Sequence, residues 1–203
     1  MEREVQERTI QGRKVIGELG GVLRGRMVSQ EAKKSLGDSV LIPTLTYRSE
    51  TWSMREGEMS KICAVEMSFL RAASGISIVE GVSNERIYEN FGMSERKDGM
   101  SCGVMEWMKR NTLRWYGHVN RLEEDRLVKR VYDSEVDGRV GRGRPLMTWD
   151  NRVDQYIGER VGKGRGAIGR AKERCGDRVA WRLFCHGHPL LGSSREGARR
   201  QRY

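Results

Sequence analysis

The sequence predicts an all-α protein in which about six to seven helices form loosely packed bundles joined by Gly/Arg-rich linkers. Apolar residues recur at three- and four-residue steps in several segments, as on one face of a helix. Only 37% of the residues are hydrophobic, 33% are charged and 25 are glycine, so we expect modest cores with mobile segments between them. At 203 residues the chain has room for one domain or two small ones.

Two helices are expected in the first part of the chain. The first covers residues 1–20 and ends or bends at Gly20-Gly21. The second runs from Ser29 to about Val40. Pro43 follows, and it should perturb any helix there because proline has no N–H donor.

A longer amphipathic helix is predicted from Glu56 to Ala73, closed by Gly75. Its apolar face consists of Ile62, Val65, Phe69 and Ala72, with Met59 and Met67 also expected to pack in the core.

A short helix should begin at Ser83 and end at Gly92. Ser83 can cap its first turn, and Val82 can pack on Ile87 at the spacing of a hydrophobic staple.

The next helix is predicted from about Asp98 to Arg121. Its apolar stripe consists of Val104, Met108, Trp115, Val119 and Leu122, so Trp115 and Val119 are expected to face the core. Arg114, His118 and Arg121 form a polar stripe, since residues three and four apart share a face. Gly117 within a helix costs roughly 1 kcal/mol relative to alanine, which indicates close approach of a neighbour to the backbone.

Three further segments complete the element prediction. A helix over about 125–132 has an apolar face made of Leu127, Val128, Val131 and Tyr132. After a basic linker, a second helix carries Trp149, Val153, Tyr156 and Ile157 on one stripe. Residues 158–170 are expected to be loose, and a last helix runs from Ala171 to about Phe184 with Val179, Trp181 and Leu183 as apolar candidates.

The positive charge of the chain lies in its second half. Residues 1–100 hold 15 Lys/Arg and 15 Asp/Glu, whereas residues 101–203 hold 23 and 13, which accounts for the whole net charge of +10. A one-sided basic field is typical of proteins that bind polyanions, because phosphate contacts release condensed counterions. A solubilising basic surface or tail is the alternative.

The cysteines and the hydropathy suggest a reduced intracellular setting, nuclear or cytoplasmic. Cys63, Cys102, Cys175 and Cys185 form no CxxC pair, and no secretory signal follows Met1. No apolar run approaches the roughly 18 residues that a membrane span needs. The spacing of Cys175 and Cys185 with His186 and His188 matches no usual zinc pattern, so we expect no metal and no cofactor.

No catalytic constellation is found. Polymerases hold two metal ions with paired aspartates, and the sequence contains no Asp-Asp pair. It also has no P-loop, no dinucleotide-binding glycine motif and no nucleophile elbow. His118 has neither a nucleophile nor a carboxylate placed with it. We therefore expect no enzymatic activity from this chain by itself.

Nucleic-acid contacts are the remaining chemistry. Arg142-Gly143-Arg144-Pro145 has the composition of an AT-hook core, whose arginines enter a narrow A·T-rich minor groove. A basic linker that contacts phosphates without sequence preference explains it equally well. Trp149 could stack on a base, but its apolar stripe favours core packing. The candidate nucleic-acid contacts are Arg114, His118, Arg121, Arg139, Arg142 and Arg144.

Ordered blocks of the sequence resemble the region after the catalytic palm in reverse transcriptases of non-LTR (LINE-type) retrotransposons. The blocks are Tyr47–Trp52, Glu66–Arg71 with Gly75-Ile76, Val82–Glu85, Leu113–Val119, Asp125–Val131, Gly141–Pro145 with Trp149, and Asp177–Arg182. One departure is Arg48, which stands where the family usually has glycine.

The resemblance implies a thumb and post-thumb region that grips RNA, DNA or an RNA–DNA hybrid while a separate palm carries out synthesis. The implied segments are 1–45 as a helical remnant of the palm–thumb junction, 46–132 as a thumb-like bundle, 133–145 as a basic linker, 146–185 as a C-terminal helical segment and 186–203 as a disordered tail. Two alternatives stay open: a small architectural DNA-binding protein that uses the Arg-Gly-Arg-Pro turn, and a translated retroelement remnant without activity.

Overall fold

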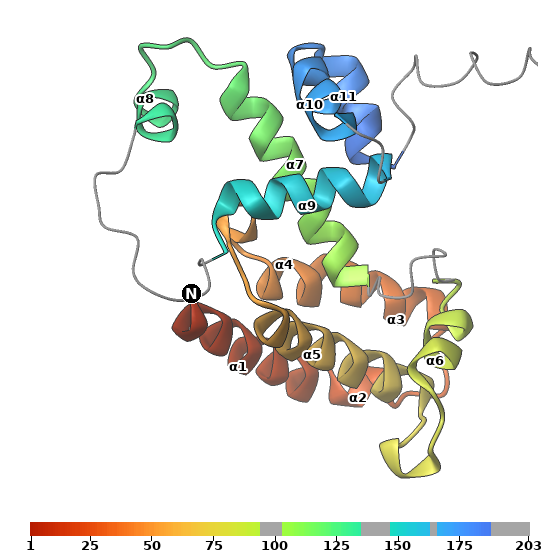
Figure 1. Ribbon diagram of the computed structural model, residues 1–203. Coiled ribbons are helices and arrows are strands. Elements are labelled where there is room, and N and C mark those ends of the chain that lie inside the picture. The colour runs from red at the N-terminus through yellow and green to blue at the C-terminus, as the bar shows by residue number, and fades with distance from the viewer. Residues whose placement is uncertain (94–102, 135–146, 163–165, 188–203) are drawn as a thin grey trace, which may run out of the picture. The chain divides into compact units, whose positions relative to one another are not determined.

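The computed structural model describes residues 1–93, 103–134, 147–162 and 166–187, and no strand occurs among them (Figure 1). The all-α prediction is confirmed. These residues contain eleven α-helical segments, more than expected, because several predicted helices are divided into short ones. The chain separates into two compact units, Met1–Met108 and Lys109–Tyr203. The boundary falls within helix α7, and each unit is described by itself.

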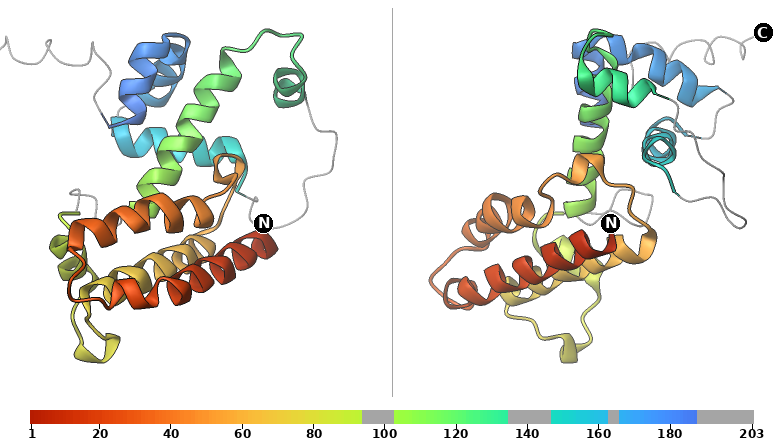
Figure 2. Two further views of the ribbon diagram at one scale, coloured as in Figure 1. Left: turned by 180° about the vertical axis from the view of Figure 1, so that it is seen from behind. Right: turned by 90° about the vertical axis from the view of Figure 1, so that its left-hand side faces the viewer.

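Unit 1 is built around two long helices. Its elements are α1 (Glu2–Glu18), α2 (Gly20–Leu23), α3 (Gln30–Leu36), α4 (Ile42–Leu45), α5 (Glu56–Ser74), α6 (Asn84–Asn90) and the first turns of α7 (Gly103–Asn120). Helices α1 and α5 run side by side in Figures 1 and 2. The break at Leu19 lies next to the predicted Gly20-Gly21, and α3 begins after Ser29 as predicted. The Ser29 hydroxyl caps this helix by accepting a hydrogen bond from the Ala32 N–H.

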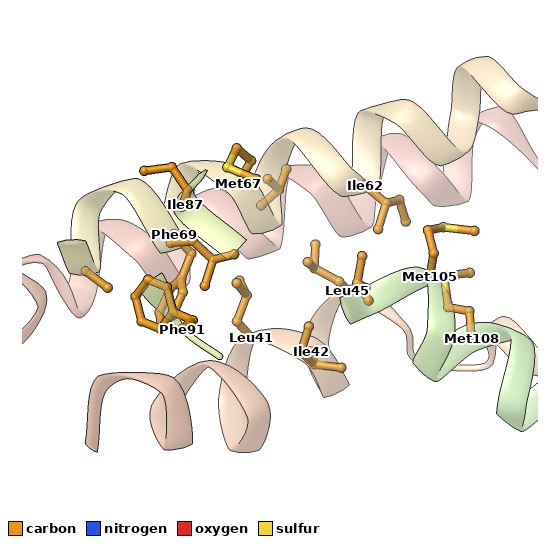
Figure 3. Packing of buried hydrophobic residues seen from close by; sticks show 14 of the residues in the cluster. Leu41, Ile42, Leu45, Ile62, Met67, Phe69, Ile87, Phe91, Met105 and Met108 are labelled. Carbon is orange, nitrogen blue, oxygen red and sulfur yellow. The ribbon is translucent and has the colours of Figure 1, made fainter. Parts of the chain in front are cut away.

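Two glycines allow the helices of unit 1 to pack closely. A Cβ atom at Gly12 of α1 would lie 2.6 Å from a Leu45 methyl group, and one at Gly37 would lie 2.7 Å from the Phe69 ring. Figure 3 shows the core around these contacts, where Phe69 and Ile62 of α5 face residues of the α4 region and of α7. Any larger side chain at either glycine would push these helices apart.

Pro43 perturbs the helix as predicted, but it does not end it. Helix α3 continues through a π-helical turn, Gly37–Leu41, in which the Ile42 N–H bonds to the Gly37 carbonyl. This wider turn precedes the proline, which lacks the N–H needed for a regular α-helical bond. Helix α4 then runs on from Ile42.

The predictions for α5 and α6 are confirmed. Gly75 closes α5 in the left-handed conformation, with φ 70°. The Ser83 hydroxyl accepts a hydrogen bond from the Arg86 N–H at the start of α6, and Ile87 is fully buried with Val82 packed against the same cluster. Cys63 in α5 is disulfide-bonded, so the expectation of reduced cysteines is wrong for this residue. Cys175 and Cys185 are free.

Unit 2 contains the rest of α7 together with four shorter helices. These are α8 (Leu127–Asp133), α9 (Trp149–Val161), α10 (Ala167–Glu173) and α11 (Arg178–Cys185), with a 3₁₀ turn over Arg174–Gly176 before α11. Its core is a separate hydrophobic cluster of Leu113, Tyr116, Val153, Tyr156, Ile157, Ala171, Cys175, Trp181, Phe184 and Cys185.

Several sequence predictions for unit 2 are wrong. Residues 158–170 are largely helical where they are described, since α9 reaches Val161 and α10 begins at Ala167. The single helix expected over 171–184 is divided by the 3₁₀ turn, after which the Asp177 carboxylate caps α11. Because α11 begins at Arg178, Val179 and Leu183 point outward, with 70% and 41% of their surface exposed. Trp181 and Phe184 lie in the core.

The apolar face predicted for residues 125–132 is also wrong. Leu127 and Val131 of α8 are 72% and 65% exposed. The residue of α8 that joins the core is Tyr132, whose ring meets Trp149 edge-on and whose hydroxyl donates to Asp150. Helix α8 is thus held at its C-terminal end, and periodicity alone did not indicate this.

Arg48 is the only described non-glycine residue with a positive φ, 61°. The left-handed conformation costs about 1–2 kcal/mol for a residue with a Cβ atom. The position where the resembling family has glycine therefore has the backbone conformation that glycine favours. The Arg48 guanidinium lies 5.4 Å from the centre of the Tyr47 ring, which offsets part of this strain.

We predict that Arg48→Gly is more stable than Arg48→Ala by about 1 kcal/mol, because both variants lose the contact with Tyr47 but only alanine keeps the left-handed strain. Urea unfolding of the two variants measures the difference. Equal midpoints would contradict the strained geometry at this residue.

A second prediction concerns Glu66, which is buried at 3% exposure in α5. Its carboxylate accepts hydrogen bonds from the Val104 N–H at 2.9 Å and from the Tyr88 hydroxyl at 3.3 Å. Burial raises its pKa from 4.5 to about 7, against the lowering effect of these two bonds, and Asp38 adds to the rise. The fold therefore favours the protonated carboxyl group.

A raised pKa in the folded state means that this stabilisation is complete below about pH 4.5 and is lost as the pH rises through about 7. We expect Glu66→Gln, which imitates the protonated form, to gain up to about 3 kcal/mol over the wild type between pH 5 and 8. Urea unfolding across this range is the measurement. The exposed Glu56→Gln in the same helix is the control, and a parallel pH dependence of Glu66→Gln and wild type would contradict the assignment.

Candidate nucleic-acid interface

Helix α7 is fixed in unit 2 by a tryptophan that lies against a glycine. The Trp181 indole N–H donates a hydrogen bond of 2.7 Å to the Leu113 carbonyl. A Cβ atom at Gly117 would overlap the indole ring of Trp181. The close approach predicted at Gly117 is therefore confirmed, and the approaching group is a fully buried aromatic side chain of α11.

This contact decides which face of α7 is buried in unit 2. Leu113 and Tyr116 lie in the core, and the Tyr116 ring is 5.8 Å from Trp181 and 6.1 Å from Trp149. Trp149 thus packs in the core, as the sequence favoured. The prediction that Trp115 also faces the core is wrong. Successive residues of a helix point about 100° apart, so burial of Tyr116 turns Trp115 aside.

Trp115 lies instead beside the polar stripe of the helix. It is partly exposed and belongs to neither hydrophobic cluster. Its ring centre is 5.3 Å from that of His118, with the two planes tilted by 36°. Both His118 and Arg114 are exposed. This face of α7 therefore presents an indole, an imidazole and a guanidinium within two helical turns.

Arg121 does not share the exposure of Arg114 and His118. Its guanidinium is partly buried and donates a hydrogen bond of 2.6 Å to the Cys175 carbonyl. It connects α7 to the 3₁₀ turn before α11, and that bond gives Arg121 a structural function.

Two exposed cations on α11 were not among the predicted sites. Arg178 and Arg182 stand four residues apart, so they share one face of the helix. Within the described residues neither they nor Arg114 forms an ion pair with an acidic group. The four-residue spacing in the sequence was the signal that could have identified them.

The thiols of unit 2 are unsuited to nucleophilic chemistry. Burial raises the pKa of Cys185 to about 11, although Arg160, Arg114 and Arg121 oppose the shift. Burial also raises the pKa of Cys175. Both groups are protonated at neutral pH, and the thiolate is the reactive form.

The remaining predicted contacts, Arg139, Arg142 and Arg144, lie outside the described residues, as do most of the linker and tail segments and His188. Over the ranges that the structure does describe, no group of three or more His, Cys, Asp or Glu side chains is arranged to hold a metal ion. No described helix combines the length and the apolar character that crossing a membrane requires.

Comparison with known proteins gives one weak likeness. The chain is 26% identical over 140 residues to an uncharacterized transposon-derived protein of Caenorhabditis elegans. The match covers 68% of this chain and 48% of the relative, so the chain spans about half the length of the curated relative that it matches. No family model matches the sequence. No solved structure matches it either.

We expect Gly117→Ala to destabilise unit 2 by about 3 kcal/mol, because the added methyl group must displace Trp181 and strain its buried hydrogen bond. Gly169→Ala in α10 is the matched control, since its Cβ would have no neighbour within 4 Å. It should be neutral or stabilise the helix by up to about 1 kcal/mol. Thermal unfolding of both variants tests this, and equal melting temperatures would contradict the close contact.

Proposed function

We propose that unit 2 binds the phosphate backbone of nucleic acid, as part of a protein derived from a LINE-type reverse transcriptase. The observation that carries the proposal is the group of exposed cations on two helices that Trp181 joins, Arg114 on α7 with Arg178 and Arg182 on α11. Side chains of this kind on a rigid support can contact successive phosphates without reading the bases.

Two further observations support this assignment. The excess of basic over acidic residues lies entirely in residues 101–203. The similarity to a transposon-derived protein agrees with the ordered sequence blocks that resemble reverse transcriptases. Since the sequence has no paired aspartates for the metal ions of a polymerase, we assign DNA synthesis to a separate palm and only binding to this chain.

The test removes three cations from unit 2 and compares their loss with an equal loss in unit 1. Arg114, Arg178 and Arg182 are changed together to glutamine. The control changes the exposed Arg13, Lys14 and Arg26 to glutamine. Affinities for labelled duplex DNA, duplex RNA and an RNA–DNA hybrid are measured by fluorescence anisotropy between about 50 and 200 mM salt.

We expect the unit 2 variant to bind more weakly. The slope of log affinity against log salt concentration should become shallower by up to about 0.9 for each phosphate contact that is lost. The control should keep the wild-type slope. Equal slopes in both variants would contradict these contacts, and a wild-type chain that binds no polynucleotide at low salt would contradict the proposed function.

The Arg-Gly-Arg-Pro sequence at 142–145 favours a second candidate, an architectural DNA-binding protein. Competition between A·T-rich and G·C-rich duplexes separates the two. A strong preference for A·T-rich DNA that disappears in Arg142→Gln/Arg144→Gln supports minor-groove binding. Equal competition supports binding to the backbone alone.

A further inference from the structure

Trp115 differs from the other tryptophans of the chain. Trp52 is buried in unit 1, Trp107 packs against the same cluster, Trp181 is buried in unit 2 and Trp149 packs against that core. All five tryptophans lie in the described residues, and Trp115 alone belongs to neither cluster. The two hydrophobic clusters therefore do not account for its ring, which is partly buried and partly exposed.

The position of Trp115 is fixed by the contact on the other side of α7. Gly117 faces Trp181, and a residue two positions away along a helix points about 200° from it. Docking of α11 thus directs Trp115 away from the core of unit 2. The ring is also held from within its own helix by His118, one turn further on. An aromatic side chain held in this way loses little conformational entropy when it binds a flat ligand.

One arginine stands beside this aromatic pair. Arg114 precedes Trp115 and is exposed, and His118 is itself exposed. Proteins that bind single-stranded nucleic acid combine aromatic side chains, on which bases stack, with cations that contact the backbone. A duplex keeps its bases paired and stacked inside, so it offers phosphates but no free base face to such a pair. An apolar protein partner would gain nothing from the adjacent guanidinium.

We propose that Trp115 and His118 form a stacking platform for the unpaired bases of single-stranded nucleic acid, with Arg114 contacting a neighbouring phosphate. This inference rests on the proposed function, because it takes unit 2 as the nucleic-acid-binding unit. It adds the class of ligand, a single strand or a single-stranded end beside a duplex.

The test uses the full-length protein with three labelled probes of equal length. They are a single-stranded oligonucleotide, the same strand with abasic sites throughout its centre, and the matching duplex. The variants are Trp115→Ala, Trp115→Phe and His118→Ala. Tyr47→Ala is the control, since Tyr47 is exposed but its ring already contacts the guanidinium groups of Arg8 and Arg48.

We expect Trp115→Ala to bind the single strand about tenfold more weakly while its salt slope stays unchanged, because stacking does not release counterions. Phenylalanine should restore most of the affinity, and His118→Ala should produce a smaller loss. The wild-type protein should bind the abasic strand about tenfold more weakly than the intact one, which tests the platform without any substitution. Duplex binding and the Tyr47→Ala control should remain close to wild type.

Two results would overturn the platform. One is equal affinity of the wild-type protein for the abasic and intact strands. The other is wild-type affinity of Trp115→Ala for the single strand. If either occurs while the arginine variant of unit 2 still loses salt-dependent binding, the stacking inference fails and the proposed function stands. If the wild-type protein binds none of the probes at low salt, both fail.

Discussion

The arrangement of unit 2 depends on the contact between Trp181 and the backbone of α7 at Gly117. The indole contributes a large apolar area and one hydrogen bond, to the Leu113 carbonyl. Both require an approach that no residue except glycine permits at position 117. Once this contact forms, Trp181 of α11 is seated on α7, and Arg121 can reach the Cys175 carbonyl in the 3₁₀ turn before α11. The destabilising effect of glycine within a helix is thereby offset by tertiary packing.

The same contact determines the chemistry of the exposed surface. The face of α7 that carries Leu113 and Tyr116 is covered, so the face that carries Arg114 and His118 remains in solvent. Unit 1 shows a different use of charge. Its first hundred residues are electrically balanced, and Glu66 within its core accepts two hydrogen bonds in place of an ion pair. Unit 1 also carries exposed cations such as Arg13, Lys14 and Arg26, but the acidic residues of 1–100 balance the basic ones, whereas basic residues are in excess over 101–203.

Sequence reasoning succeeded where the cause was local. The helix start at Ser29, the cap at Ser83, the stop at Gly75 and the disturbance before Pro43 all depend on residues within one or two turns. It failed where a residue distant in the sequence decides which face of a helix is buried. Trp115 and Tyr116 are adjacent aromatic residues on faces about 100° apart, and periodicity cannot say which one a neighbour will cover. The break between α10 and α11 has a local cause that periodicity does not register, because the Asp177 carboxylate caps α11 by accepting hydrogen bonds from the Val179 and Ala180 N–H groups.

The candidate site shows the same division between local and distant causes. The spacing of Arg114 and His118 placed them on one face, and the structure leaves both exposed. Arg121 belongs to that face by spacing, yet its guanidinium is partly buried because it donates to the carbonyl of a residue 54 positions away. An arginine that satisfies a partly buried carbonyl would leave this acceptor without its partner if it moved to a phosphate. Phosphate binding should therefore use cations without such partners, such as Arg114. The face of α7 that carries Arg114 also carries Trp115, the one tryptophan outside both hydrophobic clusters.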